Sequence, residues 1–355
     1  MHVHGARAPG QARRGRDPAG RAGDRRELTI TARPASADEA ARWDELVVAT
    51  GRPHLLQSDG WARLKAASGW RARRFVLGED GVAQVLLRSL PLGMSVAYAP
   101  RGPLVADADL VGAVAALRDA LRAERCTSLL CDPEAPAAAV STDALASARI
   151  SRSTVHVQPG RTLLMDLTQD PEAMLAAMRK KTRQYIRKGE RAGVITEETR
   201  DVGRFHRILA RVAERDRFGI HDRAYFERVA EAFGERAHFQ MARVGDDDVG
   251  ALLVARMGDR AWELFGGWSG THAEERPFYL LKWRSMMRMK QLGAVRYDMW
   301  GLAEPGDDAL AGVENFKLGF GGEVVDWIGA LETPVTPGLY PLWLLAGRRR
   351  LARSA

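Results

Sequence analysis

The stretch VRYDMWGLAEPGDDALAGVENFKLGFGGEVVDWIGALETP, from Val295 to Pro334, decides the fold and points to the chemistry. Its first six residues predict a buried strand, because β-branched and aromatic residues dominate them and Gly301 ends the run. The glycines that follow Lys317 let the backbone turn sharply and approach a ligand closely. We therefore expect Lys317 on a fixed edge of a backbone-lined acyl-transfer site. On this stretch alone, a glycine-rich hairpin with a solvated lysine fits equally well.

The composition is that of a globular protein with a sizeable core. Of its 355 residues 46% are hydrophobic, and at about 150 residues per domain the length indicates two domains. No apolar run reaches the ~18 residues of a membrane span, and no apolar signal core begins the sequence, so we expect a cytoplasmic protein without a transmembrane segment. Cys126 and Cys131 form no CxxC or Cys/His cluster, which indicates core positions and no metal site.

The net charge of +8 lies in the two ends of the chain. Residues 1–27 carry seven arginines against three acidic residues, and residues 347–355 carry four more arginines, whereas residues 28–346 are formally neutral. We expect the Gly/Pro/Arg-rich head to be disordered. Both basic ends could raise RNA association without specificity, but the charge says little about the folded domains.

One segment of the neutral body is strongly basic. Asp170 and Pro171 predict a helix start and Gly193 predicts a stop, so residues 171–191 should form one helix. The cations of its second half face only Glu190 as a counter-charge, and such repulsion favours a polyanionic partner. We predict contact with tRNA phosphates by Arg179, Lys180, Arg183, Arg187 and Lys188. A plain solvated helix is the alternative.

Both halves of the chain repeat one order of elements. The first predicts two helices over 38–68, strands over 72–78, 82–90 and 94–100, a helix over 107–124 and a strand over 126–131. The second predicts two helices over 204–233, strands over 237–243, 248–257 and 260–268, a helix over 277–292 and a strand over 295–300. This order is that of the Gcn5-related N-acetyltransferase fold. We predict an α/β (α+β) chain with two tandem acyltransferase domains, 28–160 and 161–322, each a mixed, mainly antiparallel sheet flanked by helices. Residues 162–168 would be the crossover strand, and 323–346 would pack back on the first domain.

Six motifs follow one another along most of the chain. They are LLQSDGWARLKAASGW (Leu55–Trp70), AYAPRGPLV (Ala97–Val105), LLCDPEAP (Leu129–Pro136), MRKKTRQYIRKGERAGV (178–194), FGIHDRAYFERV (218–229) and the YD-x-W-G and FK-x-GFGG pair of the opening stretch. In this order they resemble the Fem family of peptidoglycan-bridge aminoacyltransferases. The chain lacks room for the coiled-coil arm that some members of that family insert in the second domain.

The resemblance implies transfer of an aminoacyl group from a tRNA ester to a side-chain amine of a peptidoglycan stem peptide. The ester is already activated, so no metal or nucleotide cofactor is needed. The partners would be an aminoacyl-tRNA and a muramyl pentapeptide that is linked to UDP or to a lipid, and a lipid-linked acceptor would bring peripheral membrane association. The sequence names neither the amino acid nor the form of the acceptor.

The resemblance also assigns roles to single residues. Lys317 matches the family lysine that contacts the tRNA acceptor end or the reacting carbonyl, and Phe316 would pack against the same terminus. Asp132 matches the family D-P-E motif and is a candidate base, although an Asp-Pro turn is also what local structure alone would place there.

For the acceptor, the matching residues are Lys65, Arg223 and Tyr225, in a family region that grips phosphates and neighbouring groups. The spacing between Arg223 and Tyr225 is two residues tighter than in relatives, so His221 or Arg217 could share the work. Phe265 stands where some relatives have a tyrosine, which would cost one hydroxyl contact.

Two other classes of function remain open. A CoA-dependent acetyltransferase needs a glycine-rich loop for the pyrophosphate, and neither SGTHAEERPF nor APRGPLVADAD fits it; Glu274 and Glu275 would also repel the anion. A non-catalytic RNA-binding protein would explain the basic helix, but it gives no reason for Lys65, Arg223 and Lys317 to occur together.

Overall fold

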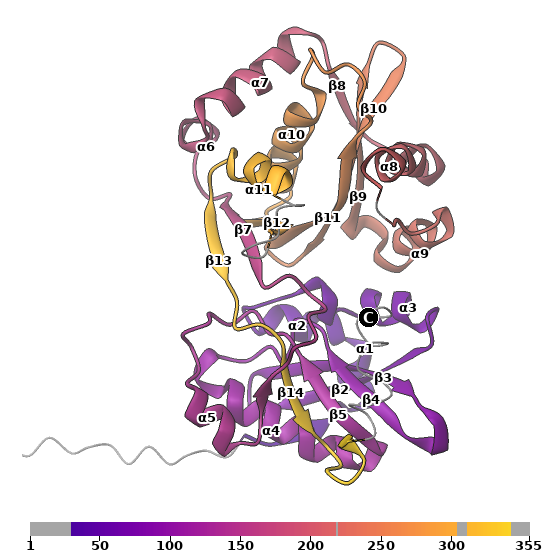
Figure 1. Cartoon of the computed structure of the whole chain (residues 1–355), viewed down its shortest axis with the longest axis vertical. Coiled ribbons are helices and arrows are strands. Elements are labelled where there is room, and N and C mark those ends of the chain that lie inside the picture. Colours follow the sequence, from indigo (N-terminus) through magenta and orange to yellow (C-terminus); the bar gives the residue numbers. More distant parts are fainter. Residues whose placement is uncertain (1–29, 218, 304–310, 342–355) are drawn as a thin grey trace, which may run out of the picture.

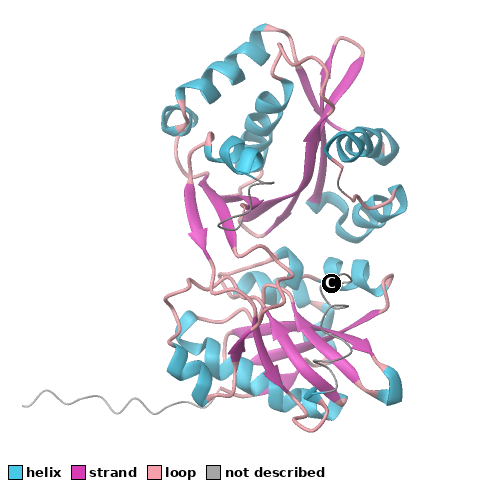
Figure 2. Ribbon diagram, viewed as in Figure 1, coloured by secondary structure: helices cyan, strands magenta, loops and turns pink. Residues whose placement is uncertain are grey.

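Two mixed sheets, each flanked by helices, lie one above the other (Figures 1 and 2). The computed structural model describes residues 30–217, 219–303 and 311–341 of the chain. The first sheet has the order β1 (Ala32–Pro34), β2 (Trp70–Leu77), β3 (Gly81–Ser89), β4 (Ser95–Ala99), β5 (Cys126–Cys131), β14 (Leu331–Pro334) and β6 (Ser151–Arg152). Its strands pair antiparallel except for the parallel pair β4–β5.

Helices cover both faces of this sheet because its strands carry apolar side chains on each face. One face packs against α2 (Trp43–Ala49) and α3 (Asp59–Ala66), and the short α1 (Ala37–Ala41) precedes them. The opposite face packs against α4 (Leu110–Ala120) and α5 (Thr142–Ser147).

The second sheet repeats the plan. Its order is β13 (Glu323–Asp326), β7 (Arg161–Asp166), β12 (Arg296–Gly301), β11 (Arg260–Trp268), β10 (Asp247–Met257), β9 (Ala237–Val244) and β8 (Ile195–Glu198), with β11–β12 as its parallel pair. Helices α8 (Val202–Asp216) and α9 (Arg223–Phe233) cover one face of it, and α9 also contacts α3 of the first domain. The other face carries α6 (Pro171–Ala177), α7 (Lys180–Arg191), α10 (Pro277–Gln291) and α11 (Ala311–Leu318).

The two domains are joined by a shared core and by the C-terminal strands. One cluster of buried apolar residues runs from Trp43 and Leu64 of the first domain to Phe226 and Trp262 of the second. The chain then passes from β13, which pairs with β7, to β14, which pairs with β5. The predicted boundary at residue 323 is therefore wrong by one strand, because Glu323–Asp326 still belongs to the second sheet.

The predicted fold class is confirmed. The second half shows the expected order of two helices, three antiparallel strands, a helix and a strand, whereas the first half has three helices, α1 to α3, where two were predicted. The prediction of one helix over 171–191 is wrong. Met178 and Arg179 are extended, and the backbone N–H of Arg179 donates to the carbonyl of Gly319 at 3.0 Å, so a tertiary contact breaks the helix into α6 and α7.

Asn315, Phe316 and Lys317 lie on helix α11 and not on a hairpin. The glycines after it were predicted to let the backbone approach a ligand, but in the structure they serve close packing within the protein: a Cβ on Gly322 would come within 2.6 Å of the Leu164 carbonyl, and one on Gly319 would meet Thr182 Oγ1 at 2.6 Å. The predicted basic head 1–27 and tail 347–355 lie outside the described residues.

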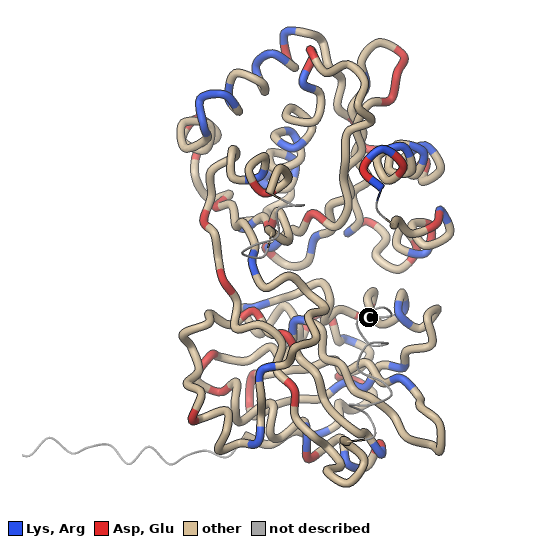
Figure 3. Tube along the Cα trace, viewed as in Figure 1, with Lys and Arg blue, Asp and Glu red and all other residues tan. Residues whose placement is uncertain are grey.

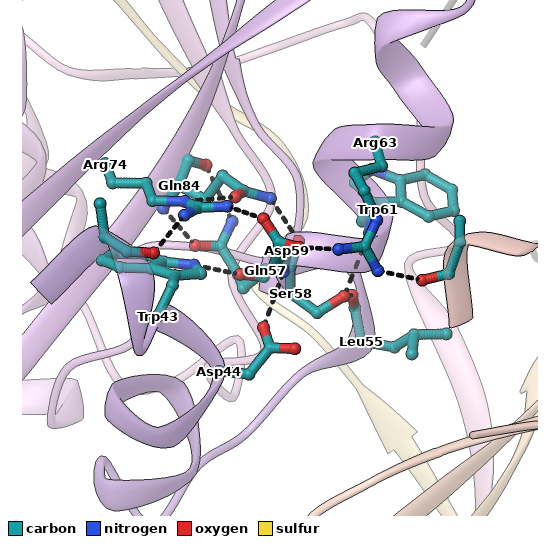
Figure 4. A network of polar contacts seen from close by, with 12 residues as sticks. Trp43, Asp44, Leu55, Gln57, Ser58, Asp59, Trp61, Arg63, Arg74 and Gln84 are labelled. Atoms are coloured by element: carbon teal, nitrogen blue, oxygen red, sulfur yellow. Dashed lines mark hydrogen bonds and ion pairs between the residues drawn. The ribbon is translucent and has the colours of Figure 1, made fainter. Parts of the chain in front are cut away.

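The Gln-Ser motif of the first domain, Gln57 and Ser58, holds neighbouring elements together through hydrogen bonds (Figure 4). The amide of Gln57 donates to the carbonyls of Gln84 at 3.1 Å and Pro100 at 2.7 Å, and its oxygen accepts from the Gln84 N–H at 2.7 Å. Ser58 accepts from the Trp61 N–H at 3.2 Å and so begins α3. The motif thereby ties α3 to β3 and to the loop after β4.

Candidate active site

The candidate site lies where strands β11 and β12 part. They pair over Arg260–Trp262 and Arg296–Asp298, after which both strands continue without pairing to each other. Trp300 has a φ of 61°, a left-handed conformation that turns β12 away from a regular ladder. Glu263 is thus the first residue of β11 beyond the paired part, opposite the end of β12.

Lys317 reaches this place from α11. Its ammonium donates to the carbonyl of Gly301 at 2.6 Å and lies 3.4 Å from that of Trp300. Burial and the nearby Lys282 cation lower the pKa of Lys317 to about 8, against the opposing effect of the Glu263 and Asp298 carboxylates. Lys317 is therefore a half-buried cation that loses its proton more readily than a solvated lysine does.

A buried polar network surrounds it. Glu263 and Lys282 form an ion pair, and both are nearly inaccessible, at 6% and 3% exposed. The Tyr297 hydroxyl donates to Glu263 Oε1 at 2.8 Å and lies 3.1 Å from the Ser285 hydroxyl. Burial raises the pKa of Asp298 to about 7, while hydrogen bonds from Thr162 and from the Trp300 N–H oppose the shift.

Phe316 belongs to an aromatic cluster beside the network. Its ring stacks on Phe278 with centroids 5.7 Å apart and meets Tyr279 edge-on at 4.9 Å. The Lys282 ammonium lies 5.6 Å from the centroids of both Phe278 and Phe316. The cluster fixes the residue next to Lys317 and offers flat apolar surface for a base or an acyl group.

The predicted acceptor residues gather in part on the other face of the second sheet. Tyr225 stacks on His221 at 3.7 Å and meets Phe265 at 6.1 Å between ring centroids. Lys65 lies 4.9 Å from the Trp61 ring, and burial together with Arg88 lowers its pKa to about 8. Burial and, to a lesser extent, the Lys65 cation lower the pKa of His221.

Arg223 departs from this group. It is the first residue of α9, and its guanidinium donates to Glu227 at 2.7 Å. The same group lies against Gly203 of α8, where a Cβ would meet it at 3.1 Å. The residue that stacks on Tyr225 is His221, one of the two residues that we predicted could share the role of Arg223.

Asp132 is an anchor for a loop in this structure. It is 3% exposed and accepts from the Tyr98 hydroxyl at 2.8 Å and from the Arg101 N–H at 2.7 Å. Burial raises its pKa, although Arg101 and these hydrogen bonds oppose the rise. The Arg101 guanidinium lies 5.8 Å from the ring of Trp300, whose carbonyl faces Lys317. Asp132 thus reaches the Lys317 region only through two intermediate residues.

Some of the predicted basic residues at α7 bind other parts of the protein, and the others are exposed to solvent. Arg183 donates to the Met178 and Ala176 carbonyls at the end of α6, and Lys188 pairs with Glu274 at 2.9 Å. Arg179 donates to the Asn315 side chain at 2.6 Å and so joins α7 to α11. Lys180 and Arg187 are exposed. Figure 3 shows that positive charge follows the length of α7.

A pocket of about 510 Å³ opens elsewhere, between the domains, at the start of β11 and β12. Its lining includes Arg52, Arg101, Glu134, Arg260 and Arg296. None of the site residues predicted from the sequence lines it, and it lies at the opposite end of β12 from Gly301.

Sequence reasoning missed Glu263, Lys282 and Asp298. A signal was present for Lys282, because a lysine inside the apolar run YLLKW of a predicted helix is unusual. Asp298 and Tyr297 stood in the strand VRYDMW, but no pattern in the sequence indicated which face of that strand each would occupy.

The chain spans part of the length of its curated relatives. It is 28% identical over 213 residues to a lipid II:glycine glycyltransferase of Staphylococcus aureus strain MRSA252, covering 54% of this chain and 50% of the relative. With the protein of the same description from strain USA300 it shares 27% identity over 258 residues, covering 67% and 58%.

Solved structures agree on the fold. The crystal structure of FemX superposes with a TM-score of 0.79 at 20% identity, covering 89% of this chain and 99% of that one. A tandem GNAT protein from the clavulanic acid biosynthesis pathway gives a TM-score of 0.50 at 15% identity, covering 87% and 99%. The sequence model of the FemAB family matches residues 39–155, 148–248 and 244–348, which is most of the chain. The chain therefore belongs to the FemAB family.

Proposed function

We propose that this protein transfers an aminoacyl group from an aminoacyl-tRNA to the side-chain amine of a peptidoglycan precursor stem peptide. The observation that supports this most is the half-buried Lys317 at the point where β11 and β12 part, in a chain of the FemAB family. The names of its relatives, glycyltransferases acting on lipid II, agree with an acyl transfer of this kind.

The chemistry needs a neutral amine and a partner for the negative charge on the ester oxygen. A lysine-like amine with a pKa near 10.4 costs about 4 kcal/mol to deprotonate at pH 7.4. Desolvation of the amine in the site would offset part of that cost. The Lys317 ammonium donates to the oxyanion of the tetrahedral intermediate, a role worth roughly 3 kcal/mol. Phe316 and its aromatic neighbours pack against the terminal nucleotide or the acyl group.

The donor is a tRNA ester and not CoA. The loop between β11 and α10 carries Glu274 and Glu275, and Glu274 is ion-paired with Lys188 of α7. A pyrophosphate at that loop would meet carboxylates where CoA enzymes offer free backbone amides. The exposed cations of α7, which joins α11 through Arg179 and Asn315, instead offer a path for a tRNA backbone toward Lys317.

The acceptor lies between α3 and the α8–α9 face of the second sheet. Lys65, Tyr225 and Phe265 hold it there, with Lys65 as the phosphate partner. Asp132 positions the Arg101 loop. Its alternative role as a base stays a prediction, which the variant Asp132→Asn tests. If Asp132 is the base, the variant loses the acidic limb of the pH profile of kcat. If Asp132 only anchors the loop, the variant has a lower melting temperature.

The test is incubation of the full-length protein with a mixture of aminoacyl-tRNAs and either UDP-linked or lipid-linked muramyl pentapeptide, with mass spectrometry of the acceptor. The expected result is a mass gain of one or more amino acid residues, abolished by ribonuclease and indifferent to acetyl-CoA. An acetyl gain that depends on acetyl-CoA would establish a CoA-dependent acyltransferase. RNA binding without any acceptor modification would establish the non-catalytic class.

A further inference from the structure

The ion pair of Glu263 and Lys282 is buried where an apolar pair would serve the fold as well. The two side chains are 6% and 3% exposed and come from β11 and α10. Removing two charges from water costs several kcal/mol per ion, and well-packed apolar replacements of such pairs are often neutral or stabilising. Fold stability therefore does not explain this ion pair. Its position near Lys317 does explain it.

The pair is held rigidly on both sides. The Tyr297 hydroxyl donates to Glu263 at 2.8 Å and is itself within 3.1 Å of the Ser285 hydroxyl. The Lys282 ammonium lies beside the stacked rings of Phe278 and Phe316, 5.6 Å from each centroid. Because Phe316 precedes Lys317 on α11, the ion pair and the candidate catalytic lysine form one packed unit.

Three charged groups influence the pKa of Lys317, each from a different element. Lys282 comes from α10, Glu263 from β11 and Asp298 from β12. Burial and the Lys282 cation lower the pKa of Lys317 to about 8, and the two carboxylates limit that shift. The Lys317 ammonium also donates to the Gly301 carbonyl at 2.6 Å, so its direction is fixed.

We propose that Glu263 and Lys282 are positioning residues that allow Lys317 to carry a proton from the attacking amine to the leaving ribose oxygen. This inference rests on the proposed function. The acceptor amine, already neutral, attacks the ester carbon to form the C–N bond. As the C–O bond to the ribose breaks, the Lys317 ammonium gives its proton to the departing oxygen. The neutral Lys317 then takes the proton that the acceptor nitrogen loses on becoming an amide, which restores the ammonium.

The charges around Lys317 make this cycle feasible near neutral pH. A solvated lysine has a pKa near 10.4, so its ammonium is a weak general acid. It would protonate the leaving oxygen too slowly. A neighbouring cation at the distance of a packed side chain favours proton release, and Glu263 holds that cation in place.

The test measures the titration of Lys317 directly, without relying on turnover. The full-length protein is trace-labelled with acetic anhydride across a pH series, and the modification of Lys317 is followed by peptide mass spectrometry. Lys282→Met should move the midpoint upward by about one pH unit, since a facing cation is lost. Glu263→Gln should move it downward or leave it in place, and the double variant should fall between the two single variants.

Lys290→Met is the matched control. It removes one charge from the same helix, but Lys290 donates to the Leu167 and Gln169 carbonyls at 2.5 and 3.0 Å and does not face Lys317. It should leave the Lys317 midpoint unchanged. Melting temperatures show which variants are folded, and the double variant, which buries no lone charge, keeps the test available if a single variant fails to fold.

The falling alkaline limb of kcat should follow the same order of shifts. A midpoint in Lys282→Met equal to that of the unmodified chain, or an equal shift in Lys290→Met, would overturn the proposal. If the unmodified chain transfers no aminoacyl group, the proposed function fails by itself, while the labelling still reports whether the pair controls Lys317. If transfer occurs but its pH profile ignores the labelling midpoint, the proton-carrying role is what fails.

Discussion

At the scale of single residues, the role of Lys317 can be tested most directly. Replacing it by Met removes the donor to an oxyanion that exists only during acyl transfer, so kcat should fall roughly 10² to 10³-fold while acceptor KM changes little. Steady-state kinetics at two salt concentrations measure this. A rise in KM for aminoacyl-tRNA alone, with a weaker salt dependence, would instead make Lys317 a phosphate contact.

The unmodified chain should show a matching pH profile. Because the pKa of Lys317 is lowered to about 8, the ammonium form is lost as pH rises through that value, and kcat should fall there. The same lowered pKa means that the unfolded chain binds more protons than the folded one between about pH 8 and 10.5, so this group adds stability as pH rises through that window. Activity and the contribution of Lys317 to stability should therefore move in opposite directions above pH 8.

The acceptor residues give a second test at this scale. Lys65→Met should raise the acceptor KM by roughly tenfold or more, since a charge-assisted phosphate contact is made in ground and transition states alike. Arg223→Met should raise it less, because Arg223 is exposed and already paired with Glu227. Equal effects of both changes on KM would return Arg223 to the acceptor site that the motif predicts.

Single residues also show why the sequence predicts the site only in part. Lys317 was visible because a lysine stood alone among glycines after a strand. Its partners were not, since Glu263 and Lys282 lie 19 positions apart and meet only when α10 folds over β11. Long-range pairs of this kind depend on register and on the face of each strand, and one sequence specifies neither.

At the scale of elements, periodicity predicted the regular helices and strands well, because each buries one apolar face. It failed where a tertiary contact decides. The basic helix breaks at Met178 because the chain around Gly319 packs into that point, and Asn315–Lys317 is helical because Phe316 and Phe320 pack on Tyr279. Glycine spacing alone fitted a hairpin there equally well.

Helix α7 carries the prediction at this scale. Lys180→Gln with Arg187→Gln should raise the KM for aminoacyl-tRNA and reduce the slope of log KM against log salt by about one to two, as expected for two lost phosphate contacts. Both side chains are exposed, so the fold should be unaffected. The matched control is Arg207→Gln with Arg211→Gln on α8, which are equally exposed arginines on the other face of the domain. An equal effect of the control would mean a diffuse charge effect and no contact at α7.

At the scale of the whole molecule, we expect the two domains to unfold together. The described part of the chain contains no helix long and apolar enough to cross a bilayer. Helix α9 of one domain instead lies against α3 of the other, and a single buried cluster joins the two domains. Arg63 of α3 donates to the Ala232 carbonyl of α9 at 2.6 Å, which adds a polar tie across that contact.

Strand β14 tests this coupling. Leu331 lies on β14 between β5 and β6, and its side chain is fully buried, so Leu331→Ala should destabilise the protein by roughly 2–5 kcal/mol. Because the shared cluster and the β13–β14 segment join the domains, hydrogen exchange should rise in β11 of the second domain as well as in β4 of the first. Val324→Ala, in the same segment but with an exposed side chain, should change neither. Faster exchange confined to the first domain would show instead that the domains unfold independently, and the Lys317 site would then owe its geometry to the second domain alone.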